Sequence, residues 1–204
     1  VWNTDDLKRF KPTPVEEARW GLAVIEDSLW ETIPKVYRRL NAIFIKHMGK
    51  SLPKNFNPIE FGSWMGGDRD GNPNVTSTTT KEVILLSRWE AAKLYEKELT
   101  KYLFRKLEEI DDLKILGPSP LIQPDRGPLA TFYIKGIHSN DVAELLDNNN
   151  ICIRSGHHCC QPLHRFYGIK STARASLSFT STPSEIDTFT EELKSVISFL
   201  KKNS

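Results

Sequence analysis

Residues 80–110 read TKEVILLSRWEAAKLYEKELTKYLFRKLEEI, and the organisation of the whole chain follows from this stretch. Its apolar residues recur at intervals of three and four, which predicts one long helix over Thr80–Ile110. The sequence changes character inside that helix: all five Trp precede residue 98 and all three Cys follow it. Domain boundaries usually lie in exposed, flexible linkers, so a change within a helix is unusual for a natural domain boundary.

The part before this helix is predicted to be helical, with breaks at Pro and Gly. Thr13 and Pro14 form an N-cap and first-position pair ahead of an acidic first turn, which predicts a helix start. We expect that helix to break at Pro34 and a second amphipathic segment to cover Val36–Met48. Residues 49–76 hold three Pro and several Gly and are predicted to be loop.

The part after this helix alternates between strand-like and helical patterns. This alternation is typical of a small α/β layer domain. The predicted strands are residues 113–116, 129–134, 151–154 and 173–179, and the predicted helices are residues 140–147, capped by Ser139, and 184–202, behind Pro183.

The composition excludes several classes of protein. The chain has 204 residues with a formal net charge of +2, so charge gives no reason to expect nucleic-acid binding. No apolar run approaches the roughly 20 residues that span a bilayer, and the charged first residues do not resemble a signal peptide. Three Cys, two of them adjacent, do not form a disulfide framework, so we expect a cytoplasmic protein.

A glycine-rich loop over residues 61–74, FGSWMGGDRDGNPN, is the strongest feature of the first part. Its four Gly allow a ligand to approach the backbone closely. Arg69 could pair with a carboxylate or phosphate, oriented by Asp68 and Asp70. A tight surface turn with Asp–Arg pairing is the alternative. A calcium loop is excluded, because the later bidentate Glu is missing.

A cysteine-containing loop over residues 154–162, RSGHHCCQP, is the strongest feature of the second part. A thiol acts as a nucleophile only as thiolate, and nearby cations favour that form. Cys159 has Arg154, His157 and His158 close in sequence, so we expect a reactive thiol. Two alternatives stay open: a loop packed by buried Cys and His, and a metal site. The metal ligands would be His157, His158, Cys159, Cys160 and His164.

Residues 1–98 resemble phosphoenolpyruvate carboxylase. Four motifs carry the resemblance: WNTDD at 2–6, KPTPVEEA at 11–18, the 61–76 loop and LLSRW at 85–89. It implies a piece of an all-α barrel enzyme that uses Mg²⁺ or Mn²⁺ to carboxylate phosphoenolpyruvate with bicarbonate. The resemblance places Ser63–Asn72 beside the substrate pocket, with Trp64 as an apolar wall and Arg69 in substrate binding. The Thr-Ala-His-Pro-Thr motif that holds the family's catalytic His does not occur here, and neither do its metal-binding carboxylates.

Residues 99–204 resemble the C-terminal small domain of group II (SufS-type) cysteine desulfurases, which are fold-type I enzymes of the class V aminotransferase family. The motifs that carry this resemblance are LGP at 116–118, GIHSNDV at 136–142, RSGHHCCQP at 154–162 and TARAS at 172–176. It implies pyridoxal phosphate as cofactor, Cys159 as the nucleophile that takes sulfur from L-cysteine, and Arg174 as the clamp on the substrate carboxylate. Cys160 departs from the family pattern, and we expect that it could accept the persulfide. No Lys of this sequence has the context of the family's cofactor-binding lysine.

The sequence therefore predicts a chimera: a mostly helical fragment, residues 1–98, joined through a long helix to a small α/β domain, residues 99–204. The favoured function is cysteine desulfurase-type sulfur transfer for iron–sulfur cluster assembly, inactive without the cofactor lysine. A fragment of phosphoenolpyruvate carboxylase and a non-enzymatic sulfur-accepting or metal-binding module are the alternatives. We expect a sulfur-acceptor protein as partner, while the oligomeric state, including a homo-oligomer, stays open.

Overall fold

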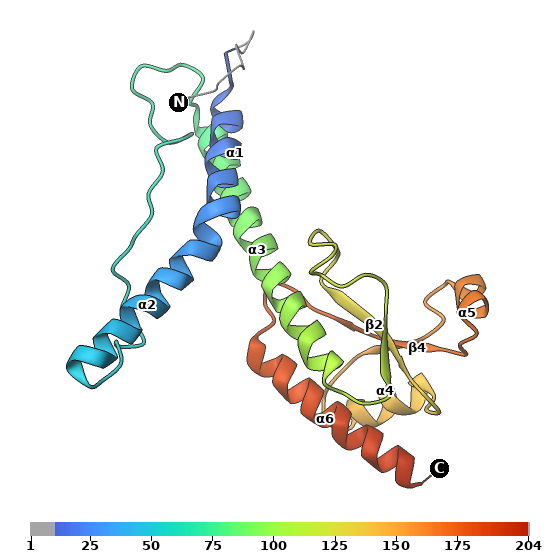
Figure 1. Cartoon of the computed structure of the whole chain (residues 1–204). Coiled ribbons are helices and arrows are strands. Elements are labelled where there is room, and N and C mark those ends of the chain that lie inside the picture. Colours follow the sequence, from blue (N-terminus) through green and yellow to red (C-terminus); the bar gives the residue numbers. More distant parts are fainter. Residues whose placement is uncertain (1–10, 204) are drawn as a thin grey trace. The chain divides into compact units, whose positions relative to one another are not determined.

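A computed structural model of the chain describes residues 11–203 and divides the chain into two compact units, one ending at Ala91 and one beginning at Ala92 (Figure 1). Helix α3 (Ser77–Glu108) passes through this division. The predicted boundary at residue 98 stays a prediction, and the motif at residues 2–6 lies outside the described residues. None of the helices over residues 11–203 carries an apolar stretch that could cross a lipid bilayer.

The first unit opens with the predicted helix, α1 (Pro14–Val24). The Thr13 hydroxyl accepts a hydrogen bond from the Glu16 backbone N–H, and the Glu16 carboxylate accepts one from the Thr13 N–H, which is a complete capping box. A π-helical turn, η1 (Ile25–Leu29), leads without a break into α2 (Trp30–Met48). The predicted break at Pro34 is wrong. Pro34 lies inside α2, near its N-terminal end, and the helix continues through it to Met48.

The loop over residues 49–76 contains no helix or strand, as predicted, and hydrogen bonds tie it to the helices on both sides. Gly66 has a left-handed backbone (φ +70°), and a Cβ built there would collide with Val83 of α3. The Thr80 hydroxyl donates to the Gly66 carbonyl at 2.7 Å. Helix α3 starts directly after Thr76, whose hydroxyl accepts from the Thr79 N–H.

The first unit buries little apolar surface. Among its described residues, the buried hydrophobic side chains are those of Ala18, Val75 and Val83. Large exposed hydrophobic side chains are numerous and lie on every helix of the unit: Trp20, Val24, Val36, Leu40, Ile43, Ile45, Met48, Ile84, Leu85 and Trp89. An apolar surface of this size marks a face that a neighbouring element normally covers.

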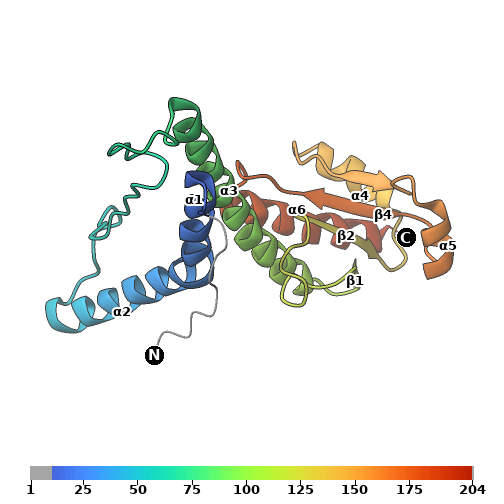
Figure 2. The same cartoon turned by 90° about the horizontal axis from the view of Figure 1, so that it is seen from above.

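The second unit is a four-stranded antiparallel sheet with helices on one face. The strands are β1 (Leu113–Leu116), β2 (Leu129–Ile134), β3 (Arg154–Gly156) and β4 (Thr172–Ser176), in the order β1-β2-β4-β3. The helices are α4 (Ser139–Asp147), α5 (Gln161–Tyr167) and α6 (Pro183–Lys202). Figures 1 and 2 show α5 beyond the end of β4, away from the helices that cover the sheet.

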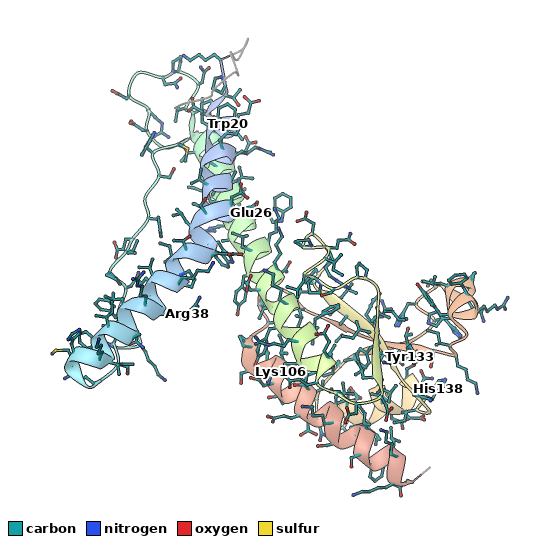
Figure 3. The ribbon with its side chains drawn as sticks, viewed as in Figure 1. Trp20, Glu26, Arg38, Lys106, Tyr133 and His138 are labelled. Atoms are coloured by element: carbon teal, nitrogen blue, oxygen red, sulfur yellow. The ribbon has the colours of Figure 1, made fainter. Side chains whose placement is uncertain are left out.

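Side-chain alternation on β2 separates two faces of this sheet. Ala130, Phe132 and Ile134 are buried, whereas the residues between them are half-exposed. The buried row packs with the second half of α3 and with α4 and α6: Leu99, Leu103, Leu107, Val142, Leu146, Ile186 and Leu193. The other face carries Thr131 and Tyr133, the second of which is labelled in Figure 3. This open face adjoins the cysteine loop.

Three predicted details of the second unit need correction. The cap of α4 is His138, whose Nδ1 accepts from the Asn140 N–H, and Ser139 is already helical. Residues 151–153 are not a strand, because pairing with β4 begins only at Arg154. Strand β4 ends at Ser176, three residues before the predicted end, because its β2 partner strand starts at Leu129.

Two matched substitutions on α3 test where the core lies. Leu107 is fully buried and Leu85 is 54% exposed, although both belong to the same helix. We expect Leu107→Ala to lower the free energy of unfolding of the second unit by about 2–5 kcal/mol through a cavity in its core. Leu85→Ala should change it by less than about 0.5 kcal/mol. Urea unfolding followed by circular dichroism measures both, and similar losses for the two variants would contradict this assignment.

Candidate functional site

The cysteine loop holds two residues in a strained backbone conformation. It connects β3 to α5, and within it His158 (φ +49°) and Cys159 (φ +61°) adopt left-handed conformations that side chains other than Gly rarely take. The Cys160 N–H donates to the His157 carbonyl at 2.8 Å and closes the turn. The result is that the Cys159 side chain is exposed while Cys160 is half-buried.

The buried side chain of His164 fastens α5 and the end of the loop to β4. Its Nδ1 lies 3.0 Å from the Cys160 carbonyl oxygen and its Nε2 lies 3.1 Å from Thr172 Oγ1. A carbonyl only accepts, so in neutral His164 the Nδ1–H donates to Cys160 and Nε2 accepts from the Thr172 hydroxyl. Thr172 is itself completely buried. Strand β4 therefore holds both ends of the cysteine loop: the β3 end through strand pairing, and the α5 end through His164.

His158 is bound to the same strand and is uncharged near neutral pH. Its Nε2 lies 3.2 Å from the Thr172 carbonyl oxygen, which it can reach only as an N–H donor. Burial lowers the pKa of His158 below its ordinary 6.5, and the charges of Arg174 and Arg154 lower it further. We expected His158 to favour the Cys159 thiolate as a cation, and its lowered pKa does not support that role. Arg154 and Arg174 remain as permanent charges.

A row of polar side chains crosses the open face of the sheet beside this loop. In the strand register, Thr131 of β2 pairs with Arg174 of β4, and Arg174 pairs with Arg154 of β3. Directly paired residues point to the same face, so two guanidinium groups stand next to each other there. The Nε atom of Arg174 is buried without a hydrogen-bond partner. Adjacent cations with an unused donor are suited to bind an anion, and a carboxylate fits the planar fork of Arg.

The thiols of Cys160 and Cys152 are both held by hydrogen bonds. Cys160 Sγ donates to the His158 carbonyl at 3.3 Å. Cys152 lies outside the loop, and its Sγ donates to Asp147 Oδ1 at 3.4 Å. That hydrogen bond, with the carboxylate charge, raises the pKa of the Cys152 thiol. Cys152 is therefore an exposed thiol that resists ionisation.

The glycine-rich loop of the first unit presents its two predicted site residues to solvent. Trp64 is 76% exposed and Arg69 is also exposed. The Gly67 and Asp68 N–H groups donate to the Trp64 carbonyl, and the Asn72 N–H donates to that of Arg69. Within the described part of the chain, Arg69 forms no ion pair with Asp68 or Asp70, so the expected Asp–Arg pairing is absent there.

Neither kind of cofactor finds a complete binding site among the described residues. No group of three or more His, Cys, Asp or Glu side chains between residues 11 and 203 is arranged to hold a metal ion. The proposed ligands His157 and His164 instead contact each other edge to face at 5.3 Å between ring centroids. Two cavities of the second unit are lined by neither Cys159 nor Arg174. The residues present thus fit a carboxylate, but not an enclosed pyridoxal phosphate.

Sequence reasoning missed Thr172 and Thr131 as members of the site. Thr172 forms hydrogen bonds with two His residues: its hydroxyl with His164 and its carbonyl with His158. The alternation in TARAS, residues 172–176, places Thr172 and Arg174 on one face and was a usable signal. Thr131 could be recognised only once the β2–β4 register was known.

Comparison with protein families separates the two parts of the chain. The family model of phosphoenolpyruvate carboxylase matches residues 1–113, and that of class-V aminotransferases matches residues 71–189. The two matches overlap over residues 71–113, which include all of helix α3.

Individual relatives divide in the same way. The chain is 52% identical over 101 residues to phosphoenolpyruvate carboxylase of Pseudomonas paraeruginosa, a match that covers 50% of this chain and 12% of that protein. It is 56% identical over 104 residues to phosphoenolpyruvate carboxylase 4 of Arabidopsis thaliana, covering 51% and 10%. Among solved structures, the apo cysteine desulfurase of Thermococcus onnurineus NA1 is similar with a TM-score of 0.51 and 28% identity, covering 59% of this chain and 30% of that one. The chain thus spans about a tenth of these curated relatives.

The lowered pKa of His158 predicts a pH dependence of stability. The pKa of His158 is lower in the folded chain than in the unfolded chain, where it is about 6.5, so the unfolded chain binds the proton more readily. The contribution of neutral His158 to the free energy of unfolding is therefore complete above pH 6.5. It is lost as the pH falls from 6.5 toward the folded pKa. NMR titration should place the imidazole midpoint below 6.5. His158→Gln should remove this part of the pH dependence from thermal unfolding curves. A midpoint at or above 6.5 would contradict the buried, neutral imidazole.

The two exposed thiols, those of Cys159 and Cys152, should differ in their rate of alkylation. Cys159 and Cys152 are both exposed, but the hydrogen bond from Cys152 to Asp147 reduces its thiolate fraction. We expect iodoacetamide to alkylate Cys159 several-fold faster than Cys152 at neutral pH, as peptide mass mapping measures. Asp147→Asn should narrow the difference by speeding Cys152. Faster alkylation of Cys152 in the unmodified chain would show that the loop does not activate Cys159.

Proposed function

Because the chain belongs to the phosphoenolpyruvate carboxylase family over residues 1–113 and to the class-V aminotransferase family over residues 71–189, we propose that its sulfur chemistry resides in the second unit. The proposed function is cysteine desulfurase-type sulfur transfer, with Cys159 as the nucleophile that takes up sulfur as a persulfide. The observation that carries the proposal is the exposed Cys159 thiol in a strained loop fastened to the strand that bears Arg174.

Each neighbouring group has a defined part in this proposal. Arg174 binds the carboxylate of the sulfur donor through its guanidinium group, and Arg154, its pairing partner on β3, adds the second charge. Neutral His158 fixes the loop by donating to the Thr172 carbonyl. His157 packs against His164 and supports the same turn.

The family implies pyridoxal phosphate, which labilises the sulfur of a bound amino acid when it is present. The described residues contribute the acceptor thiol and the carboxylate-binding arginines, and we assign them no further role toward the cofactor. The carboxylase family similarly implies a divalent metal ion. An acceptor protein that receives the sulfur from Cys159 belongs to the proposal, because an exposed persulfide is open to attack by another thiol.

For the first unit we propose only that its glycine-rich loop helps to bind an anionic substrate. Trp64 and Arg69 lie on the glycine-rich loop in the part that matches phosphoenolpyruvate carboxylase. An exposed indole and a guanidinium without an ion pair are suited to line a site for an anionic substrate. Carboxylation itself requires chemistry that this loop does not supply.

A sulfur donor that carries its own carboxylate tests both central residues. In a Cys160→Ala chain, which leaves one thiol in the loop, L-cysteine hydropersulfide should transfer its outer sulfur to Cys159, with the cysteine thiolate leaving. Mass mapping should find that sulfur on the tryptic peptide of residues 155–165. Arg174→Leu should slow this loading about tenfold or more, since a charged hydrogen bond contributes about 1.5–3 kcal/mol.

The matched control for this experiment is the methyl ester of the same donor. Because the ester has no carboxylate, Arg174→Leu should not affect loading from it, and Arg174→Lys should give an intermediate rate with the acid. Equal loading of Cys159 and Cys152 would remove the case for Cys159 as the nucleophile. An equal effect of Arg174→Leu on acid and ester would remove the carboxylate-binding role.

A further inference from the structure

The cysteine loop contains a second thiol, on the residue that follows the first in sequence. Cys159 and Cys160 are both free, and they are neighbours in sequence. Cys160 is half-buried, and its Sγ is oriented by the hydrogen bond to the His158 carbonyl, two residues back along the same turn. The Cys160 thiol is therefore confined to the inside of the turn whose outside carries Cys159. The proposed transfer function uses Cys159 alone and leaves this thiol unexplained.

We propose that Cys160 releases the sulfur held on Cys159 as free sulfide and leaves a disulfide between the two adjacent cysteines. This inference rests on the proposed function, because it requires a persulfide on Cys159. It assigns to the loop a reaction of its own, reductive sulfide release, in place of obligatory transfer to another protein.

The reaction balances within the loop. Cys160 Sγ attacks Cys159 Sγ, the bond between Cys159 Sγ and the outer sulfur breaks, and the outer sulfur leaves as HS⁻. The proton of the Cys160 thiol leaves its hydrogen bond with the His158 carbonyl and passes to solvent, so the products are one disulfide and one H₂S. The outer sulfur gains two electrons, which come from the two cysteine thiols. No external oxidant or reductant takes part in this step.

Geometry favours attack on the inner sulfur over attack on the outer one. Displacement at sulfur requires the incoming and leaving atoms to lie nearly in line. Attack on the outer sulfur would have to align two thiols of adjacent residues on opposite sides of it, which their short connection opposes. Attack on the inner sulfur leaves HS⁻ outside the ring and unconstrained. HS⁻ is also the better leaving group, because H₂S is more acidic than a cysteine thiol.

The disulfide formed in this way is easily reopened. Adjacent Cα atoms are about 3.8 Å apart, which is shorter than the roughly 4.4–6.8 Å that an unstrained disulfide spans. Strained, exposed disulfides are readily reduced by ordinary thiols. An external thiol would therefore restore Cys159 and Cys160 for another round.

Tryptic cleavage allows a direct test with an internal control. Cleavage after Arg154 and Arg165 isolates Cys159 and Cys160 together on residues 155–165, whereas Cys152 falls on residues 136–154. The unmodified chain and the Cys160→Ala chain are loaded with L-cysteine hydropersulfide, freed of excess donor by desalting, and left without reductant. Released sulfide is then measured colorimetrically, and the masses of both peptides are determined by mass spectrometry. Circular dichroism confirms that the variants fold alike.

We expect the unmodified chain to release close to one sulfide per loaded chain, with its 155–165 peptide lighter by two hydrogens than the dithiol. The Cys160→Ala chain should keep the extra sulfur on Cys159 and release sulfide only after dithiothreitol is added. Cys152→Ser should behave as the unmodified chain does.

Two outcomes would overturn the inference while leaving the proposed function intact. A stable persulfide on residues 155–165 of the unmodified chain would show that Cys160 does not attack. Extra sulfur found on Cys160 itself would show attack on the outer sulfur instead. Failure of both chains to take up sulfur is a separate result, because it overturns the proposed function and the inference together.

Discussion

Burial of the second half of helix α3 is the constraint on which the second unit of this chain depends. Leu103 and Leu107 are fully buried against the sheet and α6, and Thr100 is nearly so. The sheet has helices on one face only, so its opposite face is free to carry polar groups. Its antiparallel register then brings Arg174 and Arg154 side by side. The candidate site is thus a consequence of which face α3 covers.

The same helix shows why the two parts of the chain differ. Before Ala92, α3 presents Ile84, Leu85 and Trp89 to solvent, and α1 and α2 provide no buried counterpart for them among the described residues. This surface agrees with a unit that corresponds to a small share of a much larger relative. The two family matches overlap over a range that contains the whole of α3.

Elements with strong local signals could be predicted from the sequence, and long-range pairing could not. Helix α1 with its Thr13 cap, strands β1 and β2, and the long loop follow from periodicity and turn residues, and the structure has them. The predicted break at Pro34 is wrong, because Pro34 lies within the first turns of α2 and the helix continues past it. In the site, Cys159 and Arg174 could be named from motifs. Thr131 could not, because its place beside Arg174 is set by the register between β2 and β4.

The left-handed backbone at His158 and Cys159 has a consequence for how this loop can change over generations. Each such residue costs about 1 kcal/mol or more compared with Gly at the same position. Substitutions selected for thermal stability alone would therefore favour Gly at both positions, and Gly at position 159 would remove the thiol. Replacing Cys159 by Gly would relieve that backbone cost only by removing the thiol.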